Sequence, residues 1–154
     1  MKASALLVVT IACTGAPNTI SPHHAAAIQD SVRVVLATYQ RYGAAAQWDS
    51  LVGLYTTDST FSWIEDGRRA RGPAVRRALT SMPAGVRVET TYDSTDIVAL
   101  APGLALLTTY YDTRFVGPMS AHYNGALSMV WAHQPPGWRI VGGHSSAAIA
   151  HAAP

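Results

Sequence analysis

The chain has 154 residues, of which 49% are hydrophobic and 13% are charged. This length is typical of a single domain, and the apolar share is large enough for a sizeable core. The formal net charge is only +2 and the arginines are scattered between acidic residues, so the composition does not indicate a nucleic-acid-binding protein.

The first residues have the features of an export signal. Met1 and Lys2 precede a short apolar run that is too brief to span a bilayer as a mature helix. Cys13 follows Thr10-Ile11-Ala12, which resembles a bacterial lipobox except that Thr10 replaces the usual Leu or Val. We therefore expect a signal peptide over residues 1–16, with either a lipid on Cys13 or cleavage near Ala16. The protein would then be periplasmic, membrane-anchored through that lipid, or secreted.

A tether is predicted over residues 17–24, the folded domain over residues 25–147, and a disordered Ala-rich tail over residues 148–154. The first helix is predicted over residues 25–42, because apolar side chains recur there at three- and four-residue steps. These are Ile28, Val32, Val35, Leu36 and Tyr39. A second, shorter helix is expected over residues 48–55.

The middle of the chain predicts a small hairpin and a third helix. Asp66-Gly67 follows a short strand around Phe61 and Trp63, and this dipeptide is a strong signal for a tight reversal. Pro73 is suited to the first turn of the helix that follows. Beyond it, extended segments are predicted over residues 86–100 and 104–116, so helices come first and a meander of strands afterwards.

The last part of the domain, Ser120 to Ala147, predicts two long antiparallel strands joined at Gln134-Pro135-Pro136-Gly137. An aromatic-rich strand, a turn, Gly-Trp-Arg-Ile-Val and then Gly-His-Ser-Ser resemble the C-terminal hairpin of SnoaL-like proteins in the nuclear transport factor 2 superfamily. Residues 46–61 are similar to the second-helix signature of that family. The resemblance implies an α+β fold, in which a curved, cone-shaped antiparallel sheet wraps the N-terminal helices.

This superfamily includes ketosteroid isomerases, which use a tyrosine on the first helix, a carboxylate base at the end of the first strand and a second carboxylic acid. By that resemblance Tyr39 falls at the tyrosine position. Trp63 falls at the base position, and Leu127 or Ser128 at the second acid. Without a base the proton transfer has no acceptor, so standard ketosteroid isomerase activity is not expected.

Asp112 and His144 are the other candidate catalytic residues, because a carboxylate can orient a histidine that titrates near neutral pH. Alternation predicts that His144 shares a sheet face with Trp138 and Ile140, and Asp112 with Arg114. The alternatives are a structural Asp112–Arg114 pair on the outer face and a structural histidine at the sheet rim. A single bulge would exchange the faces.

Candidate ligand-binding residues are the aromatic side chains expected to line a cavity inside the cone. They can equally belong to the core or to a dimer interface. They are Trp48, Tyr55, Phe61, Trp63, Tyr110, Tyr123 and Trp131.

No metal site or cofactor is predicted, because the histidines follow no recognisable ligand spacing and the chain has no phosphate-binding glycine loop. The sequence leaves two functions open. One is binding of a small, largely apolar molecule in the cone, with cofactor-independent isomerase, cyclase or hydrolase chemistry. The other is a non-catalytic module that forms a homodimer through the sheet.

Overall fold

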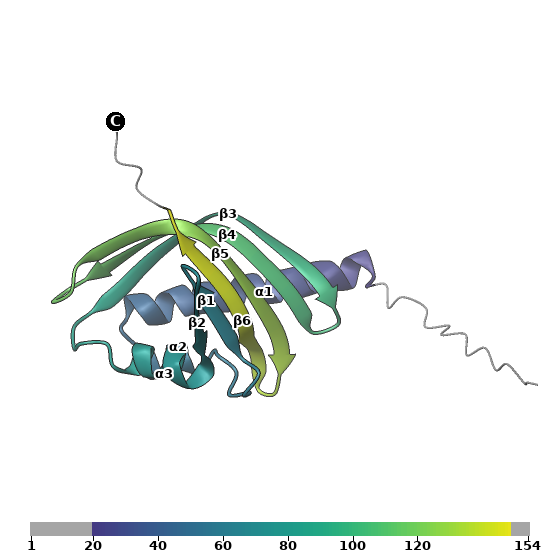
Figure 1. The fold of residues 1–154 in the computed structure, drawn as a ribbon. Coiled ribbons are helices and arrows are strands. Elements are labelled where there is room, and N and C mark those ends of the chain that lie inside the picture. The colour runs from purple at the N-terminus through teal and green to yellow at the C-terminus, as the bar shows by residue number, and fades with distance from the viewer. Residues whose placement is uncertain (1–19, 149–154) are drawn as a thin grey trace, which may run out of the picture.

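The computed structural model describes residues 20–148. The predicted signal peptide, Cys13, the start of the tether and nearly all of the predicted tail lie outside these residues. Figure 1 shows long strands arched over a long helix, with two short helices at one end of the arch. Within residues 20–148, no helix is both long and apolar enough to cross a membrane.

Helix α1, Pro22–Ala44, begins three residues earlier than the sequence pattern predicts. Ser21 is its N-cap, and the Ser21 side chain accepts a hydrogen bond of 3.2 Å from the His24 amide. This bond and Pro22 in the first turn fix the start of the helix. Residues 22–24 are therefore helical and do not belong to the tether.

The short elements come next: α2, Trp48–Val52; β1, Ser62–Glu65; β2, Arg68–Arg71; and α3, Gly72–Thr80. The predicted reversal at Asp66-Gly67 is confirmed, since both residues have positive φ, 47° and 78°. Helix α2 ends three residues earlier than predicted. The chain after it is instead bound to the last strand, because the Ile140 amide donates to the Leu54 carbonyl over 2.8 Å.

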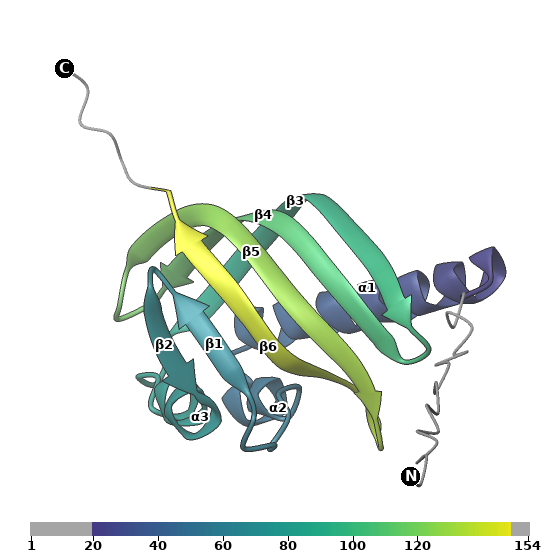
Figure 2. The ribbon, with the colours of Figure 1, turned by 45° about the vertical axis from the view of Figure 1, so that its right-hand side comes forward.

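Four long strands complete the domain: β3, Arg87–Ala101; β4, Leu104–Val116; β5, Ala121–Gln134; and β6, Gly137–Ala147. The sheet has the order β2-β1-β6-β5-β4-β3, and all pairs are antiparallel except β1 with β6. The α+β class and the curved sheet are confirmed. Both views place the three helices on the concave side of the arch (Figures 1 and 2).

The two faces of the sheet differ in burial. The concave or inner face carries Leu107, Met129 and Trp131, which are buried against Ile28, Val32 and Leu36 of α1. Each fully buried side chain of this kind contributes about 1.5–3 kcal/mol to folding. The outer face has no helix over it (Figure 1).

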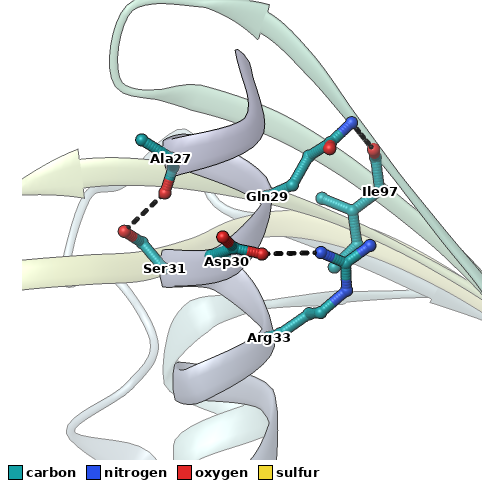
Figure 3. Close-up of polar contacts among 6 residues, drawn as sticks. All are labelled: Ala27, Gln29, Asp30, Ser31, Arg33 and Ile97. Atoms are coloured by element: carbon teal, nitrogen blue, oxygen red, sulfur yellow. Dashed lines mark hydrogen bonds and ion pairs between the residues drawn. The ribbon is translucent and has the colours of Figure 1, made fainter. Parts of the chain in front are cut away.

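Helix α1 also covers the free edge of β3. The Gln29 side-chain amide donates to the Ile97 carbonyl over 2.8 Å (Figure 3). Three helical turns later, Gln40 donates in the same way to the Thr90 carbonyl over 3.0 Å. These bonds satisfy carbonyl groups that an edge strand would otherwise expose.

Candidate functional site

Two tyrosine hydroxyl groups meet inside the cone. Tyr39 lies one turn after Leu36 on the buried side of α1, and Tyr55 is held in place by a backbone bridge to Ile140 of β6. Their hydroxyl oxygens are 2.9 Å apart, a hydrogen-bonding distance. The structure therefore joins two residues that the sequence analysis selected independently, one as catalytic and one as ligand-binding.

This hydroxyl pair has more hydrogen-bonding capacity than it uses. Each tyrosine hydroxyl carries one hydrogen and can also accept, so the mutual bond uses only one of the two hydrogens. Among residues 20–148, neither hydroxyl has another hydrogen-bond partner. One O–H group is consequently left to donate to an acceptor from outside the protein.

The electrostatic setting keeps these hydroxyl groups protonated. Burial raises the pKa of Tyr39, and the nearby charge of Glu65 adds to this rise against the opposing effect of the Tyr55 hydrogen bond. Burial also raises the pKa of Tyr55 and of Tyr92 well above the ordinary value. At neutral pH the hydroxyls of Tyr39 and Tyr55 are therefore donors and cannot act as bases.

Aromatic rings surround the hydroxyl pair. The ring centroid of Tyr55 lies 5.7 Å from that of Phe61 and 6.4 Å from that of Trp63, both in edge-to-face geometry. Between Tyr55, Phe61 and α3 there is a void of about 10 Å³, lined also by Val75 and Leu79. This void has room for about one water molecule.

Glu65 is a further candidate residue that the sequence analysis did not select. It lies two residues after Trp63 in β1, so both side chains project from the same face of that strand. Glu65 lies opposite Ser145 of the inner face, and its side chain is exposed. Burial is the main cause of the raised pKa of Tyr39, Tyr55 and Tyr111, and the charge of Glu65 adds to it. Alternation from Trp63 would have identified this carboxylate, because the position expected for a base is only two residues away.

The predicted Asp112–His144 dyad is not formed. Asp112 is on the outer face, where its carboxylate lies 2.7 Å from Nε2 of His122 and 3.7 Å from Nε of Arg114. His144 lies opposite Ser128 and not opposite Asp112. The arrangement of Asp112 with Arg114 on the outer face is the alternative that the sequence had left open.

A bulge explains the wrong face predicted for His144. Ile140 pairs with Trp131, but Gly142 pairs with Val130, so Val141 is an extra residue in β6. After this bulge, Gly143 and Ser145 continue the inner face that Trp138 and Ile140 begin. His144 is therefore exposed on the outer face.

The other predicted ligand-binding residues are dispersed. Phe61 and Trp131 are fully buried in the core, and Trp48 is partly buried at the start of α2. Tyr110 is 63% exposed on the outer face. Tyr123 contacts Phe115 next to the turn that joins β4 to β5, and their ring centroids are 5.9 Å apart. Only Tyr55, Phe61 and Trp63 lie together around the hydroxyl pair.

A second hollow lies outside the cone. It is an open groove of about 690 Å³ between the end of α1 and strands β3 and β4. Its walls carry both signs of charge, from Arg41 and Arg114 and from Glu89 and Asp112. Across residues 20–148, no three histidine, cysteine or acidic side chains gather as a metal-ligand set.

Comparison with solved structures identifies the fold. A candidate dehydratase of the nuclear transport factor 2-like family from Streptomyces avermitilis is 17% identical, with a TM-score of 0.65 over 80% of this chain and 99% of that one. A candidate scytalone dehydratase from Novosphingobium aromaticivorans is 8% identical, with a TM-score of 0.67 over 83% and 91%. A candidate calcium/calmodulin-dependent protein kinase II association domain from Xanthomonas campestris is 14% identical, with a TM-score of 0.63 over 78% and 87%.

No family model and no curated protein sequence matches the chain. The resemblance inferred from the hairpin and second-helix motifs is nevertheless confirmed at the level of fold. The chain has the nuclear transport factor 2-like fold, also called cystatin-like. Solved proteins with this fold include candidate enzymes and a candidate association domain, so the fold alone does not select a function.

Proposed function

We propose that the protein binds a small, largely apolar organic molecule that carries one hydrogen-bond acceptor. The observation that supports this is the Tyr39–Tyr55 hydroxyl pair, whose oxygens are 2.9 Å apart. One of the two O–H groups is not used in their mutual hydrogen bond and can donate to a ligand. The void beside Tyr55 has room for only about one water molecule, so a ligand would have to displace the surrounding side chains, and the rings of Phe61 and Trp63 would then offer it apolar contact. A carbonyl oxygen is the simplest acceptor for this pair.

We further propose acid/base chemistry of the isomerase, cyclase or hydrolase kind. The neutral tyrosine pair would stabilise negative charge that develops on a carbonyl oxygen, and the Glu65 carboxylate would accept a proton from the neighbouring carbon. Trp63 cannot take that role, because an indole is not a base at neutral pH. The names of two solved neighbours, both candidate dehydratases, are in keeping with such chemistry.

Binding can be tested with prodan, a small naphthyl ketone whose fluorescence responds to hydrogen bonds at its carbonyl. The Tyr39→Phe/Tyr55→Phe double variant should bind it about tenfold more weakly, the loss expected for a hydrogen bond worth about 1.4 kcal/mol. Tyr110→Phe, on the exposed outer face, is the matched control and should bind like the wild type. Equal affinity in all three proteins would refute the role of the hydroxyl pair.

The same probe tests the proton transfer. In deuterated water, the wild type should speed deuterium uptake at the carbon next to the carbonyl of prodan, as measured by mass spectrometry. Glu65→Gln keeps the size of the side chain but removes the basic carboxylate, so uptake should fall to the uncatalysed rate. Uptake that is unchanged in Glu65→Gln would show that Glu65 is not the base.

A second proposed function is a homodimeric association module, formed through the outer face of the sheet. Three large apolar side chains are exposed on that face: Ile64 at 39%, Val98 at 44% and Tyr110 at 63%. Exposed apolar side chains on an open sheet often mark an interaction surface. Sedimentation velocity at micromolar concentration tests this function directly, and a strict monomer would exclude it.

We also propose that the protein is exported, on the basis of residues 1–16. Mass spectrometry of the protein recovered from a bacterial host distinguishes the two forms. A lipid on Cys13 would leave that residue at the mature N-terminus, whereas ordinary cleavage near Ala16 would remove it. An uncleaved chain in the cytoplasm would contradict export.

A further inference from the structure

The positive charges of the folded chain gather in one segment. Residues 67–88 contain six arginines and no acidic residue, whereas the other described residues contain four arginines and all nine acidic residues of the chain. The small net charge of +2 is therefore the difference between a basic segment and an acidic remainder. Such an asymmetry is typical of proteins that bind an anionic partner.

Five of these six arginines lie on two adjoining elements. Strand β2 is the outermost strand of the sheet, and α3 follows it directly and packs against it. Both views show the two elements together at one side of the molecule (Figures 1 and 2). All five arginines are exposed. We call them the arginine edge: Arg68, Arg69 and Arg71 on β2, and Arg76 and Arg77 on α3.

The arginine edge has no counter-charge within the described chain. Among residues 20–148, none of its five guanidinium groups forms an ion pair, and Arg69 donates its 2.8 Å hydrogen bond to a neutral acceptor, the Ser62 hydroxyl. Of the two acids that precede the edge, Glu65 makes no ion pair with it, and Asp66 accepts a hydrogen bond from the Ala147 amide. An anionic partner would therefore relieve the repulsion between five like charges.

The opposite edge of the sheet is acidic. Asp93 and Asp96 lie on β3, which is separated from β2 by five strand spacings, about 24 Å. Because a negatively charged surface attracts one edge and repels the other, it would orient the whole molecule. This separation of charge matches an extended charged surface better than a single small anion.

The arginine edge also lacks the features of two other kinds of anion site. Of its members only Arg76 borders either of the two hollows described above, and that void of about 10 Å³ is too small for a phosphate group. Residues 67–88 contain no aromatic side chain on which a nucleic-acid base could stack. Guanidinium groups bind phosphate through paired hydrogen bonds, and phospholipid headgroups present many phosphates in one plane.

We propose that the arginine edge docks the protein on a membrane that contains anionic phospholipids, with β2 and α3 toward the headgroups and β3 away from them. Each arginine near such a surface strengthens binding about fivefold. This contact needs no lipid on Cys13, and it does not depend on ligand binding at the tyrosine pair.

Co-sedimentation with lipid vesicles tests the docking. Every protein in the experiment has the substitution Cys13→Ser, so that no attached lipid contributes. In about 0.1 M salt, the chain should bind vesicles of phosphatidylcholine and phosphatidylglycerol at least about tenfold more tightly than vesicles of phosphatidylcholine alone. In about 1 M salt the Debye length falls to about 3 Å, and this difference should disappear. Equal binding to both vesicles in the lower salt would overturn the proposal.

Substitutions on α3 test the surface itself. Arg76→Gln/Arg77→Gln should weaken binding to the anionic vesicles about 25-fold, whereas Arg76→Lys/Arg77→Lys keeps the charge and should stay within about threefold of the wild type. Arg33→Gln/Arg114→Gln is the matched control, because it removes the same charge from two arginines that each lie beside an aspartate. It should bind like the wild type. Equal losses in the glutamine and lysine variants, or in the glutamine variant and the control, would overturn the arginine edge as the docking surface.

Competition separates a membrane surface from other anions. Inorganic phosphate at constant ionic strength should not release the protein from the anionic vesicles, because a single anion cannot contact five separate arginines. Release by phosphate would indicate a single-anion site and overturn surface docking. Binding to a short single-stranded oligonucleotide without binding to the anionic vesicles would assign the edge to nucleic acid and overturn the membrane. Circular dichroism of each variant checks that it is folded.

Discussion

The hydroxyl oxygens of Tyr39 and Tyr55 lie 2.9 Å apart although the residues belong to different elements, one on α1 and the other bridged to β6. Removing either hydroxyl leaves the other without its protein partner. Tyr39→Phe and Tyr55→Phe should therefore each lower the free energy of unfolding by about 1 kcal/mol. Urea denaturation of both single variants and the double variant measures this.

The double variant is the informative one. Each single variant and the double variant all lose the same hydrogen bond. The double variant should therefore be destabilised by less than the sum of the two single effects. Strictly additive effects would mean that the two hydroxyls do not interact in solution.

Stability should fall in alkaline solution because of the buried tyrosines. Burial raises the pKa of Tyr39, Tyr55 and Tyr92 in the folded chain above the ordinary value of 10.0. Their contribution is fully present below about pH 10, and it is lost as the pH rises further, because the unfolded chain ionises there while the folded chain does not. Each such tyrosine can make the free energy of unfolding fall by up to about 1.4 kcal/mol per pH unit.

The measurement is the free energy of unfolding in urea between about pH 8 and about pH 11. Tyr55→Phe should show a shallower decline than the wild type, since one of the contributing groups is absent. Identical slopes would argue that Tyr55 ionises equally well in the folded and unfolded states.

Gly143 should be intolerant of a side chain. A methyl group there would overlap the Trp63 ring and lie 2.7 Å from the Ser128 carbonyl oxygen. Gly143→Ala should therefore cost about 1–3 kcal/mol of stability, as overpacking does in cores. Gly142→Ala is the control, because a methyl group added there would meet no atom closer than the Ser62 carbonyl oxygen, at 3.2 Å. If both variants unfold at the same urea concentration, Trp63 does not lie over Gly143 in solution.

The Asp112–His122 pair should matter little. Both side chains are exposed, at 41% and 51%, and exposed ion pairs contribute at most about 1 kcal/mol. Asp112→Asn should therefore change the free energy of unfolding by less than about 1 kcal/mol and leave prodan binding unchanged. A large loss of binding in this variant would place the ligand on the outer face, in the groove beside Arg114.

The fold could be predicted because its signals are local. The periodic apolar residues of α1, the Asp66-Gly67 reversal and the Pro-Gly turn before β6 each specify their own element. The order of the elements then restricts the architecture. The start of α1 and the end of α2 were predicted less accurately. The N-cap Ser21 sets the start of α1, and the hydrogen bond between Leu54 and Ile140 ends α2 early.

The site was predicted only in part, since it depends on register. Tyr39, Tyr55, Phe61 and Trp63 do lie together inside the cone, because large aromatic side chains tend to be buried, while the catalytic role of Tyr39 and the ligand-binding role of the others stay predictions. His144 was placed on the wrong face because the extra residue at Val141 has no signature in the sequence. Glu65 was not predicted, because the resemblance puts the base position at Trp63, two residues earlier on the same face of β1.

The most direct test of the proposed function is native mass spectrometry of the protein purified under mild conditions from a bacterial host. We expect the wild type to retain a small organic molecule that the Tyr39→Phe/Tyr55→Phe double variant loses. A wild type without any bound molecule, and without affinity for prodan, would contradict ligand binding at the tyrosine pair and favour the association module.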